Sequence, residues 1–180
     1  MNRISPTSDL GFKKVLASIE NTDILIGFIS DFFNITPTDV TIENPYSIKA
    51  YKELLNGKEI EQLRQTLRDV SASFATADFS SEVQIQKTRY FDERSIYYPL
   101  DRYCQNYNKF GKMELTSEGK QDRYSSLRPV YAMNILGYTH FQDQESLRIF
   151  ELYDPVRKKG LDKQLLKIGY FELTKELLEN

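Results

Sequence analysis

The residues best suited to chemistry lie in one stretch, residues 67–86, which reads as two adjacent strands. Asp69 stands at the start of the first strand. Glu82, Gln84 and Gln86 alternate with apolar residues in the second, so their side chains are expected on one strand face. Neighbouring strands that bring carboxylates together make a site for a hard divalent cation, which prefers carboxylate and amide oxygens. Such a cation supports phosphodiester hydrolysis, because it polarises the phosphoryl oxygen and supplies a hydroxide nucleophile.

Each of these residues also has a purely structural explanation. Asp is disfavoured in strands and needs a partner or an ion when it is buried, but Asp69 could equally face solvent at a strand end. Glu82 reads equally as an exposed strand carboxylate, and the amides of Gln84 and Gln86 as cross-strand hydrogen-bonding groups. The pattern therefore indicates a metal site without requiring one.

Five segments, in this order, resemble the PD-(D/E)XK nuclease superfamily, in particular its recombination-promoting nuclease or transposase branch. They are DLGFKKVL at 9–16, LRDV at 67–70, VQIQ at 83–86, F-x-x-R-x-x-YY at 91–98, and Y-x-x-L-x-PV at 124–130. The resemblance implies an α/β domain with a mixed central β-sheet flanked by α-helices, the restriction-endonuclease-like αβββαβ core. It also implies DNA as the partner and Mg²⁺ or Mn²⁺ as the cofactor.

The resemblance leaves the catalytic register open. With residues 83–86 aligned to the family strand, Gln84 stands where the family has its catalytic Glu, and Gln86 stands where a Gln replaces the superfamily Lys. A neutral amide is a weaker metal ligand than a carboxylate and cannot act as a base. Glu82 offers a second register, because Glu82-Val83-Gln84 is itself an E-x-Q. Side chains two residues apart on one strand face lie roughly 7 Å apart, so Glu82 is expected to reach the metal only if the strand is shifted.

Two readings follow for the function. In the first, the chain is a Mg²⁺-dependent DNA endonuclease in which Asp69, Glu82 and Gln84 hold the metal and Gln86 or Gln84 orients the attacking water. In the second, it is a catalytically degenerate nuclease fold that binds DNA or a protein. A third, weaker alternative is a module that forms a homodimer through a long helix bearing Tyr97 and Tyr98.

Basic residues follow the second strand directly. Lys87 and Arg89 would place positive charge at the mouth of the site, and Arg94 resembles the family's Arg and could clamp a phosphate. The alternatives are a solvated strand end for Lys87 and Arg89, and an ion pair with Asp92, Glu93 or Asp101 for Arg94. Asp9 matches a family acid that can lie near the metal, and it reads equally well as a helix cap.

Composition bounds the remaining possibilities. The 180 residues are expected to form one domain, 1–180, short at its C-terminus relative to the family. The net charge of −2 provides no overall basic field for nucleic acid. The lone Cys104 excludes an internal disulfide and reads as a core thiol, and the chain lacks both a secretory h-region and a membrane-length apolar run. A cytoplasmic protein without a membrane partner is expected.

Periodicity places the elements that would position the site. Helices are expected over about 9–19, 22–34 and 91–110, the last with an apolar stripe of Ile96, Leu100, Tyr103, Tyr107 and Phe110. Strands are expected within 40–48, in the hairpin, and over 129–141, 147–153 and 165–173, the last either internal or at an edge. Residues 48–63 read as part helix and part loop, 111–126 as a loop, and 174–180 as the start of a helix.

Overall fold

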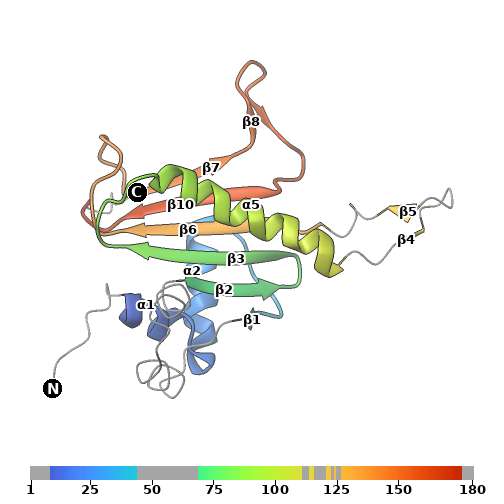
Figure 1. The fold of residues 1–180 in the computed structure, drawn as a ribbon, viewed down its shortest axis with the longest axis horizontal. Helices are drawn as coiled ribbons and strands as arrows, with labels where there is room; N and C mark the ends of the chain where they lie inside the picture. The colour runs from blue at the N-terminus through green and yellow to red at the C-terminus, as the bar shows by residue number, and fades with distance from the viewer. Residues whose placement is uncertain are drawn as a thin grey trace.

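A six-stranded mixed sheet runs through the centre of the protein (Figure 1). The computed structural model describes residues 9–43, 69–110, 114–115, 121–122, 124 and 127–175. The strand order is β1 (Thr41–Ile42), β2 (Asp69–Phe74), β3 (Ala77–Gln84), β6 (Val130–Leu136), β10 (Leu166–Glu172) and β7 (Leu147–Glu151). Strands β3, β6 and β10 are parallel, whereas β1, β2 and β7 run antiparallel to their neighbours.

Helices cover both faces of this sheet. On one side lie α1 (Asp9–Leu16), the 3₁₀ turn η1 (Ile19–Asn21) and α2 (Thr22–Phe33), and on the other lies α5 (Phe91–Phe110) (Figure 1). Helix α2 ends where Asn34 adopts a left-handed conformation, with φ of 52°, and its N–H donates to the Ser30 carbonyl. The succession α2-β1-β2-β3-α5-β6 is the αβββαβ order, so the predicted α/β, restriction-endonuclease-like fold is confirmed.

The main hydrophobic core lies between the sheet and helices α1 and α2. Val70, Ala72 and Phe74 of β2 are buried on this face together with Ala77 and Phe79 of β3. Their alternation leaves the other face of the hairpin to polar residues, as a strand period of two requires. Phe79 is fully buried, and its ring meets those of Phe28 and Phe33 edge-on, each at 6.3 Å. Aromatic burial on one side therefore fixes which residues face α5.

Helix α5 has the predicted bounds but buries a different face. The expected apolar stripe is partly on the surface, since Ile96 and Leu100 are 46% and 44% exposed. Phe91, Ser95 and Pro99, spaced four residues apart, are buried instead. Phe91 packs with Leu136, Ile168 and Tyr170, whereas the small Ser95 and Pro99 lie against the small and polar side chains of β3 and β6. Hydrophobicity alone therefore predicted the wrong side of this helix.

Other boundaries differ locally from the sequence expectations. Helix α1 ends at Leu16, three residues early, and β10 is internal, between β6 and β7. Cys104 is exposed and is not a core thiol. Within 111–126, the predicted loop, β4 (Glu114–Leu115) pairs with β5 (Gln121–Asp122), and β8 (Tyr153–Asp154) pairs with β9 (Lys159–Gly160) after β7. The predictions for 48–63 and for the last five residues of the chain lie outside the described residues. None of the described helices is long and apolar enough to cross a membrane.

The aromatic core gives a first prediction. Phe79→Ala should lower the free energy of unfolding by about 3–5 kcal/mol, because it removes a fully buried ring and leaves a cavity. Urea denaturation followed by circular dichroism measures this change. Phe150→Ala, at a ring that is 45% exposed, is the matched control and should cost clearly less. Equal losses for the two variants would contradict the assigned core.

Candidate active site

The β2–β3 hairpin sets two acidic residues opposite each other. A two-residue turn, Ala75-Thr76, connects the strands, and Asp69 is the direct cross-strand partner of Glu82. Residues directly opposite in an antiparallel pair are near neighbours on one face, with Cβ atoms roughly 5 Å apart. Only the backbone of Asp69 belongs to the described part of the structure, and the backbone pairing defines this register. No strand shift is needed to bring Glu82 opposite Asp69, contrary to the sequence expectation.

The strand ends two residues after Glu82. Gln84 is the last residue of β3 and shares the face of Glu82, while Gln86 is exposed beyond the strand end. The expectation that Gln86 continues this face is therefore wrong. The main chain of Gln86 nevertheless contacts the site, because Nε2 of Gln84 donates to the Gln86 carbonyl at 2.8 Å. That bond uses the NH₂ group of the Gln84 amide, fixes the orientation of the amide and leaves Oε1 available as an acceptor.

Glu82 is an almost buried carboxylate held by an arginine from α5. Its residue is 8% exposed, and Nη2 of Arg94 donates to its Oε1. Burial of the guanidinium works to lower the Arg94 pKa, but the charges and hydrogen bonds of Glu82 and Tyr98 together outweigh it, so the pKa is raised above its usual value. Arg94 thus pairs with neither Asp92, Glu93 nor Asp101, the partners expected from sequence. The ion pair places a permanent positive charge beside Glu82.

A second ion pair repeats this arrangement farther along β3. Nε of Arg102 donates to Oδ2 of the buried Asp78 at 3.2 Å, and Arg102 also pairs with Glu43 beyond β1. Arg94 and Arg102 are eight residues apart, or about 12 Å along a helix. Asp78 and Glu82 are four residues apart, or about 13 Å along a strand. The two spacings match, so α5 lies antiparallel along β3 with an arginine at each carboxylate.

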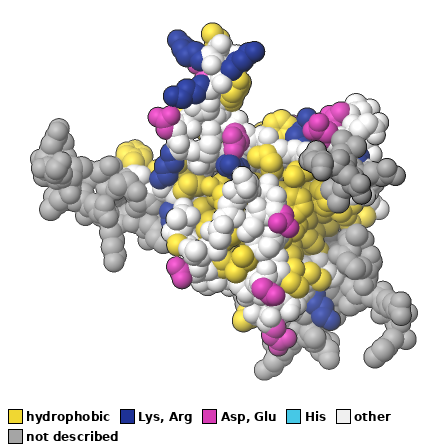
Figure 2. Space-filling view, turned by 180° about the vertical axis from the view of Figure 1, so that it is seen from behind, with side chains coloured by type: hydrophobic (Ala, Val, Ile, Leu, Met, Phe, Trp, Pro, Cys, Tyr) yellow, Lys and Arg dark blue, Asp and Glu magenta, His cyan; other side chains and the backbone are white. Residues whose placement is uncertain are grey.

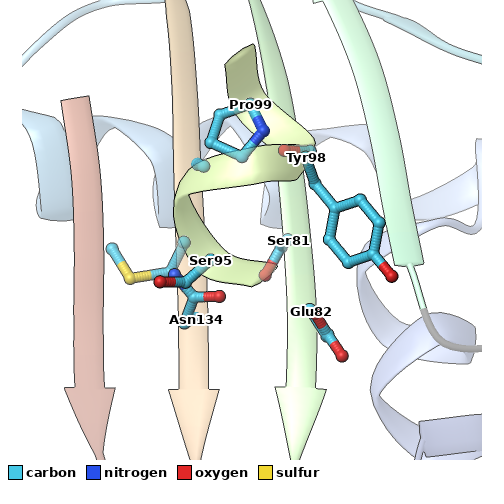
Figure 3. A pocket seen from close by; sticks show the side chains of 9 residues that line it. Ser81, Glu82, Ser95, Tyr98, Pro99 and Asn134 are labelled. Atoms are coloured by element: carbon cyan, nitrogen blue, oxygen red, sulfur yellow. The ribbon is translucent and has the colours of Figure 1, made fainter. Parts of the chain in front are cut away.

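A small cavity of about 40 Å³ lies between α5 and the sheet (Figure 3). Ser95 and Pro99 line it from the helix, and Ser81, Glu82 and Asn134 line it from β3 and β6. Asn134 is the β6 neighbour of Glu82 in register, and its Nδ2 donates to the Gly169 carbonyl at 3.2 Å. The volume is enough for a water molecule, which these side chains could hydrogen-bond. Asn134 and Ser95 were not identified from the sequence, because only the crossover to β6 brings them here.

Tyr138, just after β6, also belongs to the surroundings of Glu82. Burial raises its pKa to about 12, with further contributions from the carboxylates of Asp92 and Glu82. Asp92 in turn lies 2.8 Å from Nε2 of His140, so the first turn of α5 is tied to the segment after β6. His140 is therefore a structural partner of α5. It lies four residues beyond the end of β6, which stops at Leu136 and not near 141 as the sequence predicted.

The remaining predicted residues surround the hairpin. Lys87 and Arg89 are exposed in the connection from β3 to α5, and Arg89 lies over the Tyr90 ring at 5.7 Å. Asp9 is the first residue of α1, and its side chain lies outside the described part. One turn farther, Lys13 is 3% exposed on this helix, which packs near β2 and β3. A buried lysine in this place had no distinguishing signal in the sequence.

The donors in the hairpin fit a hard divalent cation. Among the described side chains, no group of three His, Cys, Asp or Glu residues converges on one point. The Glu82 carboxylate, the Asp69 position opposite it and the Gln84 amide oxygen nevertheless supply the oxygen donors that Mg²⁺ and Mn²⁺ prefer, and such ions need few protein ligands. The register thus places the two acids opposite each other, as a site for such an ion would need.

Comparison with known proteins agrees with this geometry. A family model described as PD-(D/E)XK nuclease family transposase matches residues 6–179. The chain belongs to this family. No curated protein and no solved structure matches it significantly. Membership of the PD-(D/E)XK nuclease family supports a nuclease or transposase-like role and implies DNA as the substrate; nucleases of this kind generally use divalent metals.

The Arg94–Glu82 ion pair gives a stability prediction. Arg94→Met should lower the free energy of unfolding by about 1–3 kcal/mol, because it removes a charged hydrogen-bond donor from the nearly buried Glu82 carboxylate. The double variant Arg94→Met/Glu82→Gln should recover part of that loss. Chemical denaturation of the single and double variants measures the coupling. Additive losses would show that the two side chains do not interact in solution.

Tyr138 gives a prediction for alkaline pH. Its folded-state pKa, about 12, lies above the ordinary value of 10, so folding favours the neutral phenol. The stabilisation is complete below pH 10 and is lost as the pH rises towards 12. The free energy of unfolding should therefore fall more steeply over this range in the wild type than in Tyr138→Phe. Identical pH profiles would place the phenol in an ordinary solvated environment.

Proposed function

We propose that this PD-(D/E)XK family member is a divalent-metal-dependent DNA endonuclease whose centre is the Asp69–Glu82 pair. The observation that carries the proposal is the hairpin register, which sets these two acids directly opposite each other with Gln84 two residues farther on. This register favours Glu82-Val83-Gln84 as the E-x-Q of the family. The alternative alignment, with Gln84 in the place of the acid and Gln86 after it, puts its second residue outside the strand.

Asp69 and Glu82 would hold the cation, with Oε1 of Gln84 as a third oxygen donor on the same face. When bound, Mg²⁺ or Mn²⁺ would polarise the phosphoryl oxygen and make water a stronger nucleophile. Gln84 is suited to its role because its Nε2 is engaged by the Gln86 carbonyl, which keeps Oε1 available to accept or coordinate. Gln86 would act through its main chain.

Positive charge around the pair would serve the DNA backbone. Arg94 already reaches Glu82, so its guanidinium can neutralise charge on a phosphate that approaches the site. Lys87 and Arg89 are exposed directly after β3, where they can contact neighbouring phosphates. Charge brought in by these side chains offsets the acidic balance of the whole chain, which has 26 acidic against 24 basic residues.

A second candidate function rests on the same ion pair. Because Arg94 neutralises Glu82 within the protein, the fold is stable without a cation at this position, as a catalytically degenerate DNA- or protein-binding module requires. The exposed Ile96, Tyr97 and Leu100 of α5 offer such a module an apolar surface, including one for self-association. This candidate predicts that acid substitutions leave every DNA interaction intact.

Cleavage of supercoiled plasmid in Mg²⁺ or Mn²⁺ tests the proposal. Asp69→Asn and Glu82→Gln should each reduce the cleavage rate at least about 100-fold, beyond the effect typical of losing an outer-shell partner of a metal site. EDTA should abolish cleavage. Glu20→Gln, an identical change on the exposed η1 turn, is the matched control and should keep full activity.

Two further variants test which alignment of residues 82–86 with the family's E-x-Q motif is correct. Gln84→Ala should reduce the cleavage rate, whereas Gln86→Ala should leave it unchanged because the Gln86 carbonyl remains. The reverse result would support the alternative alignment. Full activity of Glu82→Gln, or no cleavage by folded wild type in either metal, would refute the endonuclease and favour the binding module.

A further inference from the structure

A β-hairpin projects from the body of the protein between β7 and β10 (Figure 1). Its strands are β8 and β9, and its tip is Pro155-Val156-Arg157-Lys158. The hairpin forms a separate two-stranded sheet and contributes no residue to either hydrophobic core cluster. Its sequence is therefore not explained by packing of the domain.

The hairpin tip concentrates positive charge. Arg157, Lys158 and Lys159 are consecutive, and the side chains of Arg157 and Lys159 are 79% and 74% exposed. Figure 2 shows Lys and Arg side chains gathered on this projection. Because the whole chain carries a net charge of −2, this local excess is a departure from its average surface.

The nearby acids do not remove this charge. Arg157 pairs with Asp154 at 3.0 Å, and Lys159 lies 3.5 Å from Asp162, both in exposed positions. Ion pairs in water contribute only about 0–1 kcal/mol, so a phosphate can replace either acid at little cost. Lys158 makes no ion pair within the described part of the chain.

The tip is also ordered in advance. Oδ1 of Asp154 accepts hydrogen bonds from the N–H groups of Val156 and Arg157, at 2.9 and 3.2 Å. Pro155 restricts the turn further. This turn holds Val156 84% exposed at the end of the hairpin. A surface segment fixed in one conformation loses less entropy on binding.

We propose that the β8–β9 hairpin is a DNA-contacting arm that docks on duplex DNA outside the cleavage site. A two-stranded ribbon fits the major groove, and consecutive cations at its tip can contact the phosphates along its walls. The exposed Val156 offers an apolar contact to base methyl groups. This inference deepens the proposed function, since it rests on DNA as the substrate.

The distance from the acids determines the length of DNA that the arm requires. In the sheet, β3 and β7 are separated by β6 and β10, which places them roughly 14 Å apart at the usual strand spacing. The hairpin extends beyond β7, so one duplex that reaches both places must span more than about 4 base pairs at 3.4 Å each. Duplexes long enough to contact both should bind better than short ones.

Binding of a fluorescein-labelled 20-base-pair duplex in EDTA, followed by anisotropy at several salt concentrations, tests the arm without cleavage. The triple variant Arg157→Ala/Lys158→Ala/Lys159→Ala should bind about 10-fold or more weakly and lower the salt slope by about 0.9 for each lost phosphate contact. Lys158→Ala alone should lower the slope by about 1. Lys14→Ala, at an exposed position on α1, is the matched single-charge control and should change neither value.

The outcomes of this assay are separable from those of the cleavage assay. In the triple variant, plasmid cleavage should show a raised KM with unchanged kcat, because Asp69 and Glu82 are untouched. Wild-type affinity and salt slope in the triple variant would overturn the arm while leaving the endonuclease intact. If the triple variant binds weakly but also has a lowered Tm, its weak binding reflects unfolding. Normal binding by Lys158→Ala alone would then overturn the arm and leave the endonuclease intact. No DNA binding by the wild type would overturn the arm, whereas the expected binding pattern without any cleavage would support the arm and refute the endonuclease.

Discussion

The register of the β2–β3 hairpin is the constraint on which the candidate site depends. Buried side chains of Val70, Phe74 and Phe79 fix one face against α1 and α2, so the polar residues are assigned to the other face. A shift of one strand by one residue would turn its side chains to the opposite face and expose these buried side chains. The cost of that exposure keeps Asp69 opposite Glu82. The hydrophobic core thus determines the position of the acids without contacting them.

The part of β3 that faces α5 is polar, and its charges help to position the helix. Arg94 and Arg102 meet Glu82 and Asp78 because two helical turns and four strand residues cover nearly the same distance. Both of these buried carboxylates therefore have a guanidinium partner, as burial of charge requires. The same pairing brings Arg94, the proposed phosphate partner, to the hairpin. The same ion pairs therefore dock the helix and place its positive charges at the candidate site.

Sequence periodicity predicted the bounds of the elements better than the faces they bury and the contacts they make. It placed α5 at its observed bounds, but a stripe that includes Ile96 and Leu100 suggested the wrong buried face. The reason is that α5 packs on Ser80, Ala132 and Asn134, where small helix residues fit and large ones do not. The partners of Arg94 were missed for a related reason. A local search finds acids within one or two helical turns, whereas Glu82 is brought near by the β3–α5 connection.

The sequence by itself determined the α/β class, the hairpin, and the acids and the Gln84 amide along its polar face, because strand alternation and turn position are local properties. The family resemblance was equally readable from short segments, and the match over residues 6–179 confirms it. Only the tertiary structure decided between Glu82 and Gln84 as the partner of Asp69, since cross-strand register depends on how the apolar face packs. It also decided that β3 ends before Gln86 and that Asn134 lies beside Glu82. These placements follow from contacts between segments far apart in the chain, which no local pattern encodes.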